Sequence, residues 1–224
     1  LNRLRNGFVD GVIIAGTGHN NRLIRDIQAS GIAIVQMVRR QDKRISSIVA
    51  DYEACGKDAV CFLYDKGCRE IGLINGSLEL DPYKGRHDGY CKAIKKLGLN
   101  INLSQSDYPV NSFEHGYECA HQLLDDVPEL DAIMTAVDIQ GLGAIRALTE
   151  RKIRMPEQIK VISLTGHAVG RMLETSMTSM EMPAHEMGKK AARMVIDEIN
   201  APSDQKPSTQ HVTFATALVE REST

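Results

Sequence analysis

Short apolar runs alternate along the chain with longer segments in which apolar residues recur every three or four positions. The short runs predict buried strands, and they occupy residues 10–16, 32–38, 47–50, 71–74, 132–137, 161–164 and 178–182. The longer segments predict amphipathic helices. The helix expected after Asp51, which can cap it, carries its apolar residues on one face: Cys55, Ala59, Phe62 and Leu63. Alternating strands and helices are typical of an α/β fold with parallel sheets covered by helices.

The periodic pattern is lost over residues 99–110, and we interpret this segment as a crossover into a second half of the chain. A later helix, predicted to begin near Pro183, could return to the first half, and the tail could add one or two edge strands. We expect a ligand cleft between two lobes, with the crossing strands as a hinge. The predicted lobes are both βαβ, Rossmann-like units, formed by residues 1–99 with 181–204 and by residues 100–180 with 205–224.

Polar residues follow two of the predicted strands at their carboxyl ends. Asp138 follows the strand at 132–137, and Thr165, Gly166 and His167 follow the strand at 161–164. Ligands of open α/β sheets bind beyond the carboxyl ends of the strands, so Asp138, Thr165 and His167 are candidate ligand-binding residues. The alternative for Asp138 is a helix N-cap that binds no ligand.

The turn GTGH, which contains Gly16, Thr17 and His19, follows the first predicted strand and precedes a helix. Its backbone N–H groups and the Thr17 hydroxyl could bind the oxygens of a ligand. The turn is not a GxGxxG motif and lacks the lysine of a P-loop, which disfavours nucleotide binding. A ligand-lining loop and a tight turn with incidental polarity both stay open.

Two arginines complete the set of candidate ligand-binding residues. Arg86 is expected on the loop after the strand at 71–75, and Arg39 follows the strand at 32–38. A guanidinium group can offer paired donors to vicinal hydroxyls or to a carboxylate. The alternative for Arg86 is a solvated surface arginine.

Composition narrows the classes of function. The net charge of −2 over 224 residues argues against a basic nucleic-acid-binding surface on this chain. Five cysteines without a CxxC or zinc spacing predict buried thiols in a reduced cytoplasm, with no metal and no cofactor. No secretory signal and no long apolar run is found, so no membrane contact is expected. No nucleophile accompanies His167, so no enzymatic activity is predicted.

Several motifs in order resemble the effector-binding region of bacterial LacI-type transcriptional repressors, whose fold is similar to that of periplasmic sugar-binding proteins. DGVII at residues 10–14 is similar to a strand of that family, and residues 49–76 are similar to its V-x-D-N-x-x-G segment with the helix and strand that follow. GRHDGYCKAIKKLGL at 85–99 resembles R-x-x-G-Y-x-x-A-L-x-x-x-G. Residues 137–164 resemble N-D-x-x-A-x-G-x-x-x-A-L and its following strand, and LVEREST resembles the closing L-V-x-R-x-S.

The resemblance implies that Arg86 and Asp138 contact the effector. It also implies a homodimer that binds operator DNA through a separate helix-turn-helix domain. The sequence departs from the family at Val137, where asparagine is usual, and at Thr165-Gly166-His167, where Asp-Asp is common. Within the family, the segment that begins SLTGH is similar to sucrose-type operon repressors. The helix-turn-helix and the first strand and helix of the family are not found in the sequence.

We therefore predict an effector-sensing domain that binds a small sugar or sugar phosphate between its lobes and thereby modulates operator binding. One alternative is a free-standing sugar-binding protein of a transport system, which would need a secretory signal. A second alternative is a hydrolase or isomerase on the same scaffold, which fold analogy alone does not exclude.

Overall fold

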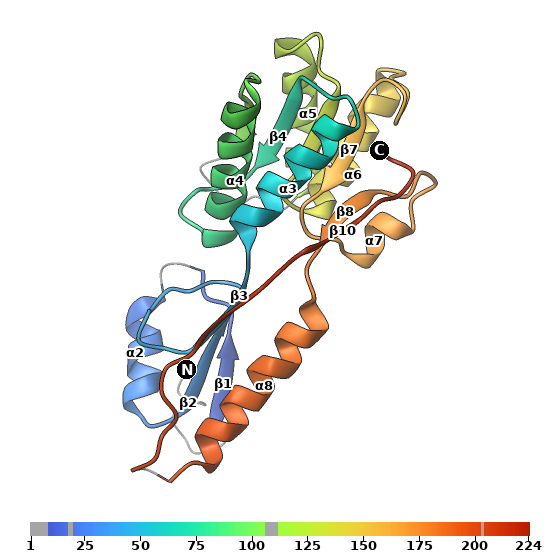
Figure 1. Cartoon of the computed structure of the whole chain (residues 1–224). Coiled ribbons are helices and arrows are strands. Elements are labelled where there is room, and N and C mark those ends of the chain that lie inside the picture. The colour runs from blue at the N-terminus through green and yellow to red at the C-terminus, as the bar shows by residue number, and fades with distance from the viewer. Residues whose placement is uncertain (1–8, 18–19, 106–111, 203) are drawn as a thin grey trace. The chain divides into compact units, whose positions relative to one another are not determined.

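The structure, a computed structural model, describes residues 9–17, 20–105, 112–202 and 204–224. The described chain alternates strands and helices, which confirms the predicted α/β class (Figure 1). The elements are β1 (Gly11–Ile14), α2 (Asn21–Ala29), β2 (Ala33–Met37), β3 (Ser47–Ala50), α3 (Tyr52–Asp65), β4 (Ile71–Asn75), α4 (Asp81–Leu97), β5 (Asn102–Gln105), α5 (Phe113–Asp126), β6 (Ala132–Thr135), α6 (Asp138–Glu150), β7 (Lys160–Ser163), α7 (Ala168–Arg171), β8 (Thr178–Glu181), α8 (Ala184–Asn200), β9 (His211–Phe214) and β10 (Ala217–Val219).

The chain divides into two compact units, and their boundaries differ from the predicted lobes. The first unit contains Leu1–Ala50 and Pro183–Phe214, and the second contains Asp51–Met182 and Ala215–Thr224. Residues 51–99 were expected in the first lobe, but β4 pairs with both β5 and β6 of the second unit. Residues 205–214 were expected in the second lobe, but β9 pairs with β3. Both assignments were wrong because a hydrophobic run reveals a strand and not its neighbours.

The first unit is built on a parallel sheet in the order β1-β2-β3-β9. Helices α2 and α8 cover its opposite faces (Figure 1). Side chains alternate along β2, so that Ile34 packs with Ile24 and Ile27 of α2. On the other face, Gly11 of β1 lies directly beneath Val195 of α8, where a larger residue would collide.

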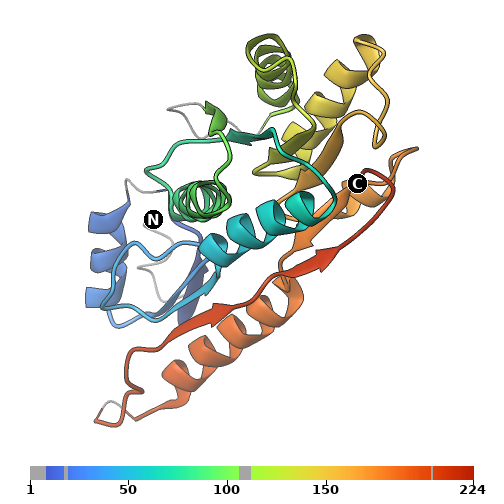
Figure 2. The same ribbon diagram turned by 45° about the horizontal axis from the view of Figure 1, so that its top comes forward.

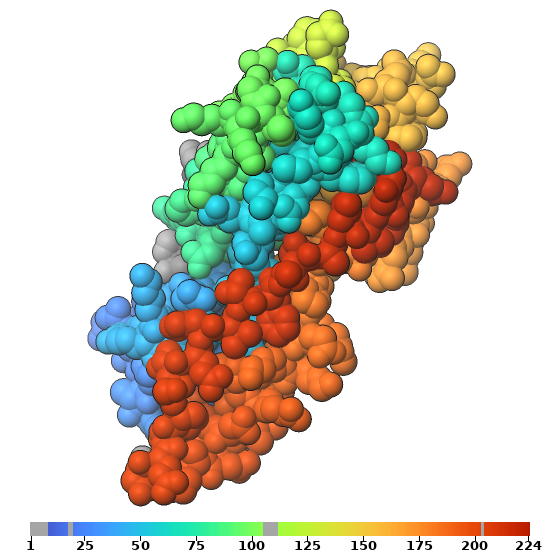
Figure 3. Space-filling model, in the orientation of Figure 1, coloured from blue at the N-terminus to red at the C-terminus, as the bar shows by residue number. Residues whose placement is uncertain are grey.

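The second unit has a sheet in the order β10-β8-β7-β6-β4-β5, parallel except for the edge strand β10. Figures 1 and 2 show α3 and α4 on one face and α5 and α6 on the other. The alternation along β4 divides the core accordingly, because Leu73 packs under α3 and α4 while Ile74 packs under α5 and α6. The red end of the chain lies on the surface of each unit (Figure 3), in agreement with the edge positions of β9 and β10.

Glycines bring the helices of the second unit into backbone contact. A Cβ atom on Gly89 of α4 would overlap the backbone oxygen of Glu53 on α3. A Cβ atom on Gly116 of α5 would overlap the backbone oxygen of Gln140 on α6. Because backbone atoms cannot rotate away, these positions require glycine, and both helix pairs are held at a fixed close distance.

Local predictions agree with the structure except at α4 and β5. The predicted cap is confirmed, since Asp51 accepts a hydrogen bond from the backbone N–H of Ala54 at 2.9 Å. Helix α4, however, begins at Asp81, well before the apolar stripe that starts at Tyr90. Pro82 lies in its first turn, where it favours helix, and the polar run that follows hides the helical period. Strand β5 also lies in the segment that was interpreted as an aperiodic crossover.

Candidate functional site

The order of strands in the second unit defines where a ligand would bind. Strand β4 has β5 on one side and β6 on the other, and the helices that lead to these two strands, α4 and α5, pack on opposite faces. The chain therefore changes direction between β4 and β6. In open α/β sheets the crevice at such a switch point, beyond the carboxyl ends of the strands, is the usual ligand site.

Asp138 lies at this edge of the sheet as the first residue of α6, and it is 1% exposed. Its Oδ2 accepts a hydrogen bond from the Thr165 hydroxyl, and its Oδ1 accepts one from the backbone N–H of His167 at 3.0 Å. The backbone N–H of Asp138 donates to Thr165 Oγ1 at 3.2 Å. The structure thus brings three predicted residues together. Each carboxylate oxygen keeps a further lone pair with which it can accept a ligand hydroxyl.

Arg86 lies inside α4 and is 2% exposed, so the loop position and the solvated-surface alternative are both wrong. Its Nη2 donates to the Leu164 carbonyl, just past β7, at 3.0 Å, and its guanidinium carbon lies 5.2 Å from the centre of the Tyr52 ring. Its Nε is buried without a partner. An unsatisfied buried donor is uncommon in proteins, and this one could donate a hydrogen bond to an acceptor atom of a bound ligand.

Cys55 of α3 shares the Leu164 carbonyl with Arg86. Its thiol donates to that oxygen at 3.7 Å. Burial raises the pKa of Cys55, against the opposing effect of the Arg86 guanidinium. The thiol is therefore neutral and serves as a weak donor, not as a nucleophile.

Replacing Arg86 by alanine is expected to destabilise the second unit by about 1.5–3 kcal/mol, the usual contribution of a hydrogen bond to a charged group. Arg86→Met removes the charge and preserves most of the packing of the side-chain stem. We expect the urea midpoint of Arg86→Met to lie between those of the wild type and Arg86→Ala. A wild-type midpoint in Arg86→Ala would contradict the buried position.

Two further polar residues at this edge were missed by the sequence analysis. Asn75 ends β4 and Thr135 ends β6, and both are fully buried. The Asn75 amide donates to the Tyr83 carbonyl at 3.2 Å, while its Oδ1 and the Thr135 Oγ1 have no partner. The signal that could have found them is a polar residue as the last member of an otherwise apolar strand.

The first unit carries a second group of polar residues at the carboxyl ends of β1 and β2. Arg39 Nη1 donates to the Gly16 carbonyl at 2.7 Å, and Arg39 Nε is buried without a partner. Thr17 is exposed and accepts a hydrogen bond from the Asn20 amide at 3.1 Å. The predicted residue His19 lies outside the described residues.

Gln41 was not predicted, although it lies against Gly16. A Cβ atom at Gly16 would overlap the Gln41 side-chain oxygen, and neither polar atom of the Gln41 amide has a partner. The Gln36 side chain fixes this loop, because its Oε1 accepts from the backbone N–H groups of Gln41 and Asp42 at 2.8 and 2.9 Å. Arg44 donates hydrogen bonds to Asp42, which lowers the pKa of that carboxyl group. Asp42 is therefore a structural anion.

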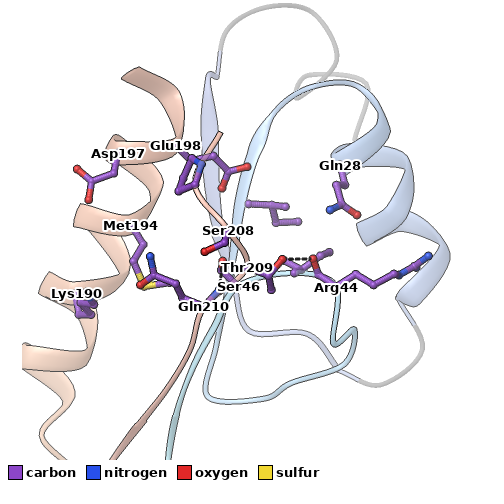
Figure 4. A pocket seen from close by; sticks show the side chains of 13 residues that line it. Gln28, Arg44, Ser46, Lys190, Met194, Asp197, Glu198, Ser208, Thr209 and Gln210 are labelled. Carbon is purple, nitrogen blue, oxygen red and sulfur yellow. Dashed lines mark hydrogen bonds between the residues drawn. The ribbon is translucent and has the colours of Figure 1, made fainter. Parts of the chain in front are cut away.

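A cavity of about 180 Å³ lies elsewhere in the first unit, at the amino ends of β2, β3 and β9. Figure 4 shows its side chains on α8, on α2 and on the segments that precede β3 and β9. Lys190 and Arg44 are its basic residues, and Asp197 and Glu198 are its acidic ones. No predicted ligand-binding residue lines it, and none of the unpartnered buried side-chain atoms of the described chain belongs to it.

The described residues include neither a cluster of metal-binding side chains nor a membrane-spanning helix. They contain no group of three histidine, cysteine or acidic side chains that could hold a metal ion. Their five cysteines are all free thiols. No helix among them is both long and apolar enough to cross a membrane.

Residues 60–224 match the family model of the periplasmic binding protein-like domain. The chain belongs to this family. Among curated proteins it is 27% identical to the HTH-type transcriptional regulator CelR of Thermobifida fusca, over 88% of this chain and 59% of that protein. It is 28% identical to the HTH-type transcriptional repressor PurR of Pasteurella multocida, over 88% and 60% of the respective chains. The chain thus spans about three fifths of the length of these relatives.

Two solved structures agree with the fold. The CelR–cellobiose complex superposes with a TM-score of 0.87 at 26% identity, covering all of this chain and 68% of that one. A LacI family regulator from Enterococcus faecium with bound ribose superposes with a TM-score of 0.87 at 20% identity, covering 99% and 82%. The second likeness concerns the fold alone. Together with the curated relatives, the first supports the resemblance to the effector-binding domain of LacI-type regulators.

Proposed function

We propose that this chain is the effector-sensing domain of a LacI-type transcriptional regulator and that it binds a small carbohydrate. One observation carries the proposal: buried polar groups with free hydrogen-bonding capacity gather at the switch point of the second unit, namely Arg86, Asn75 and Asp138. They include a cationic donor, a carboxylate acceptor and a neutral amide. Sugar hydroxyls both donate and accept, so they match such a mixed set.

The binding residues of the first unit would be Gly16, Thr17, Arg39 and Gln41, with His19 retained as a prediction. Those of the second unit would be Arg86, Asn75 and Asp138, with Thr165 and His167. CelR was solved with cellobiose, which supports a carbohydrate for this chain as well. Sucrose and sugar phosphates belong to the same proposal.

Effector binding would regulate operator binding because it is thermodynamically linked to the conformation of the domain. A ligand shifts a conformational equilibrium only by its difference in affinity for the two states. An effector that favours one state of the domain would thereby change operator affinity, through a separate helix-turn-helix domain. We further propose that the chain forms a homodimer, which would match the two-fold symmetry of operators. We also propose a cytoplasmic location and no catalytic activity.

A thermal-shift screen tests carbohydrate binding. At about 100 times its dissociation constant, a sugar that binds only the folded chain adds about 2.7 kcal/mol to the free energy of unfolding. For a chain of this size we expect a rise of about 5–10 °C in melting temperature. The screen uses cellobiose, ribose, sucrose and their phosphorylated forms. If every sugar moves the midpoint by less than about a degree, carbohydrate binding is contradicted.

A further inference from the structure

A chain of hydrogen bonds connects α5 to the residue that precedes Asp138. The backbone N–H of Val137 donates to Gln140 Oε1 at 3.2 Å. The amide nitrogen of Gln140 lies 3.1 Å from His115 Nδ1, and His115 Nε2 lies 3.3 Å from the Cys119 sulfur. Gln140 is fully buried, so this series of hydrogen bonds lies within the interface of α5 and α6.

The direction of each bond follows from chemistry. A backbone N–H can only donate, so the Gln140 oxygen must face Val137 and the Gln140 NH₂ group must face His115. His115 Nδ1 must then accept and cannot carry a proton. The ring proton therefore lies on Nε2 and points at the Cys119 sulfur. Only the neutral imidazole completes the chain of bonds.

The surroundings of His115 favour this neutral form. Burial lowers the pKa of His115, and Glu118 on the same helix acts in the opposite direction. From α6 the ring meets the neutral Gln140 amide, and burial raises the pKa of Cys119, which leaves a neutral thiol. The Asp138 carboxylate on α6 is engaged by Thr165 and His167.

Close packing transmits the position of His115 to α6. Gly116, the next residue, lies against the backbone oxygen of Gln140, so the two helices cannot shift independently at this point. The Gln140 side chain in turn caps the N-terminus of α6 by holding the Val137 N–H, as a capping-box glutamine does. Asp138 is the next residue along this turn.

We propose that His115 is a positioning residue for Asp138, which it holds through Gln140 and releases on protonation. A protonated Nδ1 would direct a hydrogen toward the Gln140 NH₂ group, and two donors cannot bond. The N-terminal turn of α6 would then lose its cap at mildly acidic pH. The importance of this for ligand binding rests on the proposed function, because Asp138 is a proposed effector contact.

The sign of the pH effect follows from linkage. Because the folded state disfavours the charged ring, the cap is complete above the ordinary histidine pKa, about 6.5. It is lost as the pH falls through the lowered pKa of His115 in the folded chain.

Amide hydrogen exchange at Val137, followed by NMR without any sugar, tests the proposal. In the wild type we expect the protection factor of this amide to fall about 5- to 10-fold between pH 7.5 and 5, the effect of losing one helix cap. The ring signal of His115 should titrate over the same range. His115→Asn, whose oxygen accepts a hydrogen bond without titrating, should keep the protection at both pH values. His115→Leu should lack it at both.

A matched control lies on the same helix. His121 accepts a bond from Arg151 at its Nδ1, away from Gln140, so His121→Asn should leave the protection of Val137 and its pH dependence unchanged. The proposal is overturned if wild-type protection is constant down to pH 5, or if His115→Asn shows the wild-type fall. It is also overturned if His115→Leu retains full protection. Since no sugar is present, these outcomes leave the proposed carbohydrate binding untouched.

Discussion

Asp138→Ala is expected to weaken sugar binding by roughly 10- to 150-fold. The carboxylate offers charge-assisted hydrogen bonds, which contribute about 1.5–3 kcal/mol each, and this free energy converts directly to the change in affinity. The substitution also releases the Thr165 hydroxyl and the His167 N–H, so the turn that carries both loses its anchor. Calorimetric titration with the sugar that gives the largest thermal shift measures the effect.

The control for this variant is Asp197→Ala. Asp197 lines the cavity at the opposite ends of the strands in the first unit, and we expect its removal to leave sugar affinity unchanged. The N-cap of α6 is Val137, so the helix-cap alternative for Asp138 is wrong. If Asp138 only anchored the turn that carries Thr165 and His167, Asp138→Ala would lower the free energy of unfolding and leave affinity intact. That result would remove Asp138 from the proposed site.

Gly89→Ala is expected to lower the free energy of unfolding by about 1–3 kcal/mol, the usual cost of overpacking. The added methyl group would overlap the Glu53 backbone oxygen and lie 2.9 Å from the Lys57 backbone nitrogen. Neither atom can rotate away, so α3 and α4 must separate. Because α4 also carries Arg86, sugar affinity should fall as well.

The matched control is Gly188→Ala in α8, where a Cβ atom would meet nothing within 4 Å. Alanine is the better helix former, so we expect a gain of about 0.5–1 kcal/mol at this position. Urea unfolding of both variants measures the difference. Equal midpoints would mean that α3 and α4 are not in backbone contact.

The sequence alone reveals those parts of the site that depend on local order. Asp138 follows a clear apolar strand, and Thr165 and His167 follow another, so their convergence could be predicted from the rule for strand ends. The Asp51 cap was predictable for the same reason, because residue type and position along the chain are sufficient.

Features that depend on the packing partner could not be predicted. Strand β4 pairs with β6, so residues 51–99 belong to the second unit. No local sequence pattern identifies β6 as the neighbour of β4. The burial of Arg86 depends on Tyr52 and Leu164, which are distant in sequence. Gln41 lies against Gly16 of another loop, and Gln36 holds the loop that carries Gln41, a relation without a sequence signature.

The most direct test of the central claim is NMR chemical-shift mapping of the bound sugar on the isotope-labelled chain. The proposed site lies at the carboxyl ends of the strands, whereas the cavity of the first unit lies at the amino ends, so binding at each place would perturb different amides. Binding at the proposed site should perturb the backbone amides of Gly16, Asn75, Asp138 and His167 and leave the residues around the cavity, 44–46 and 207–210, unchanged. Perturbation confined to 44–46 and 207–210, or none in either group, would contradict the account.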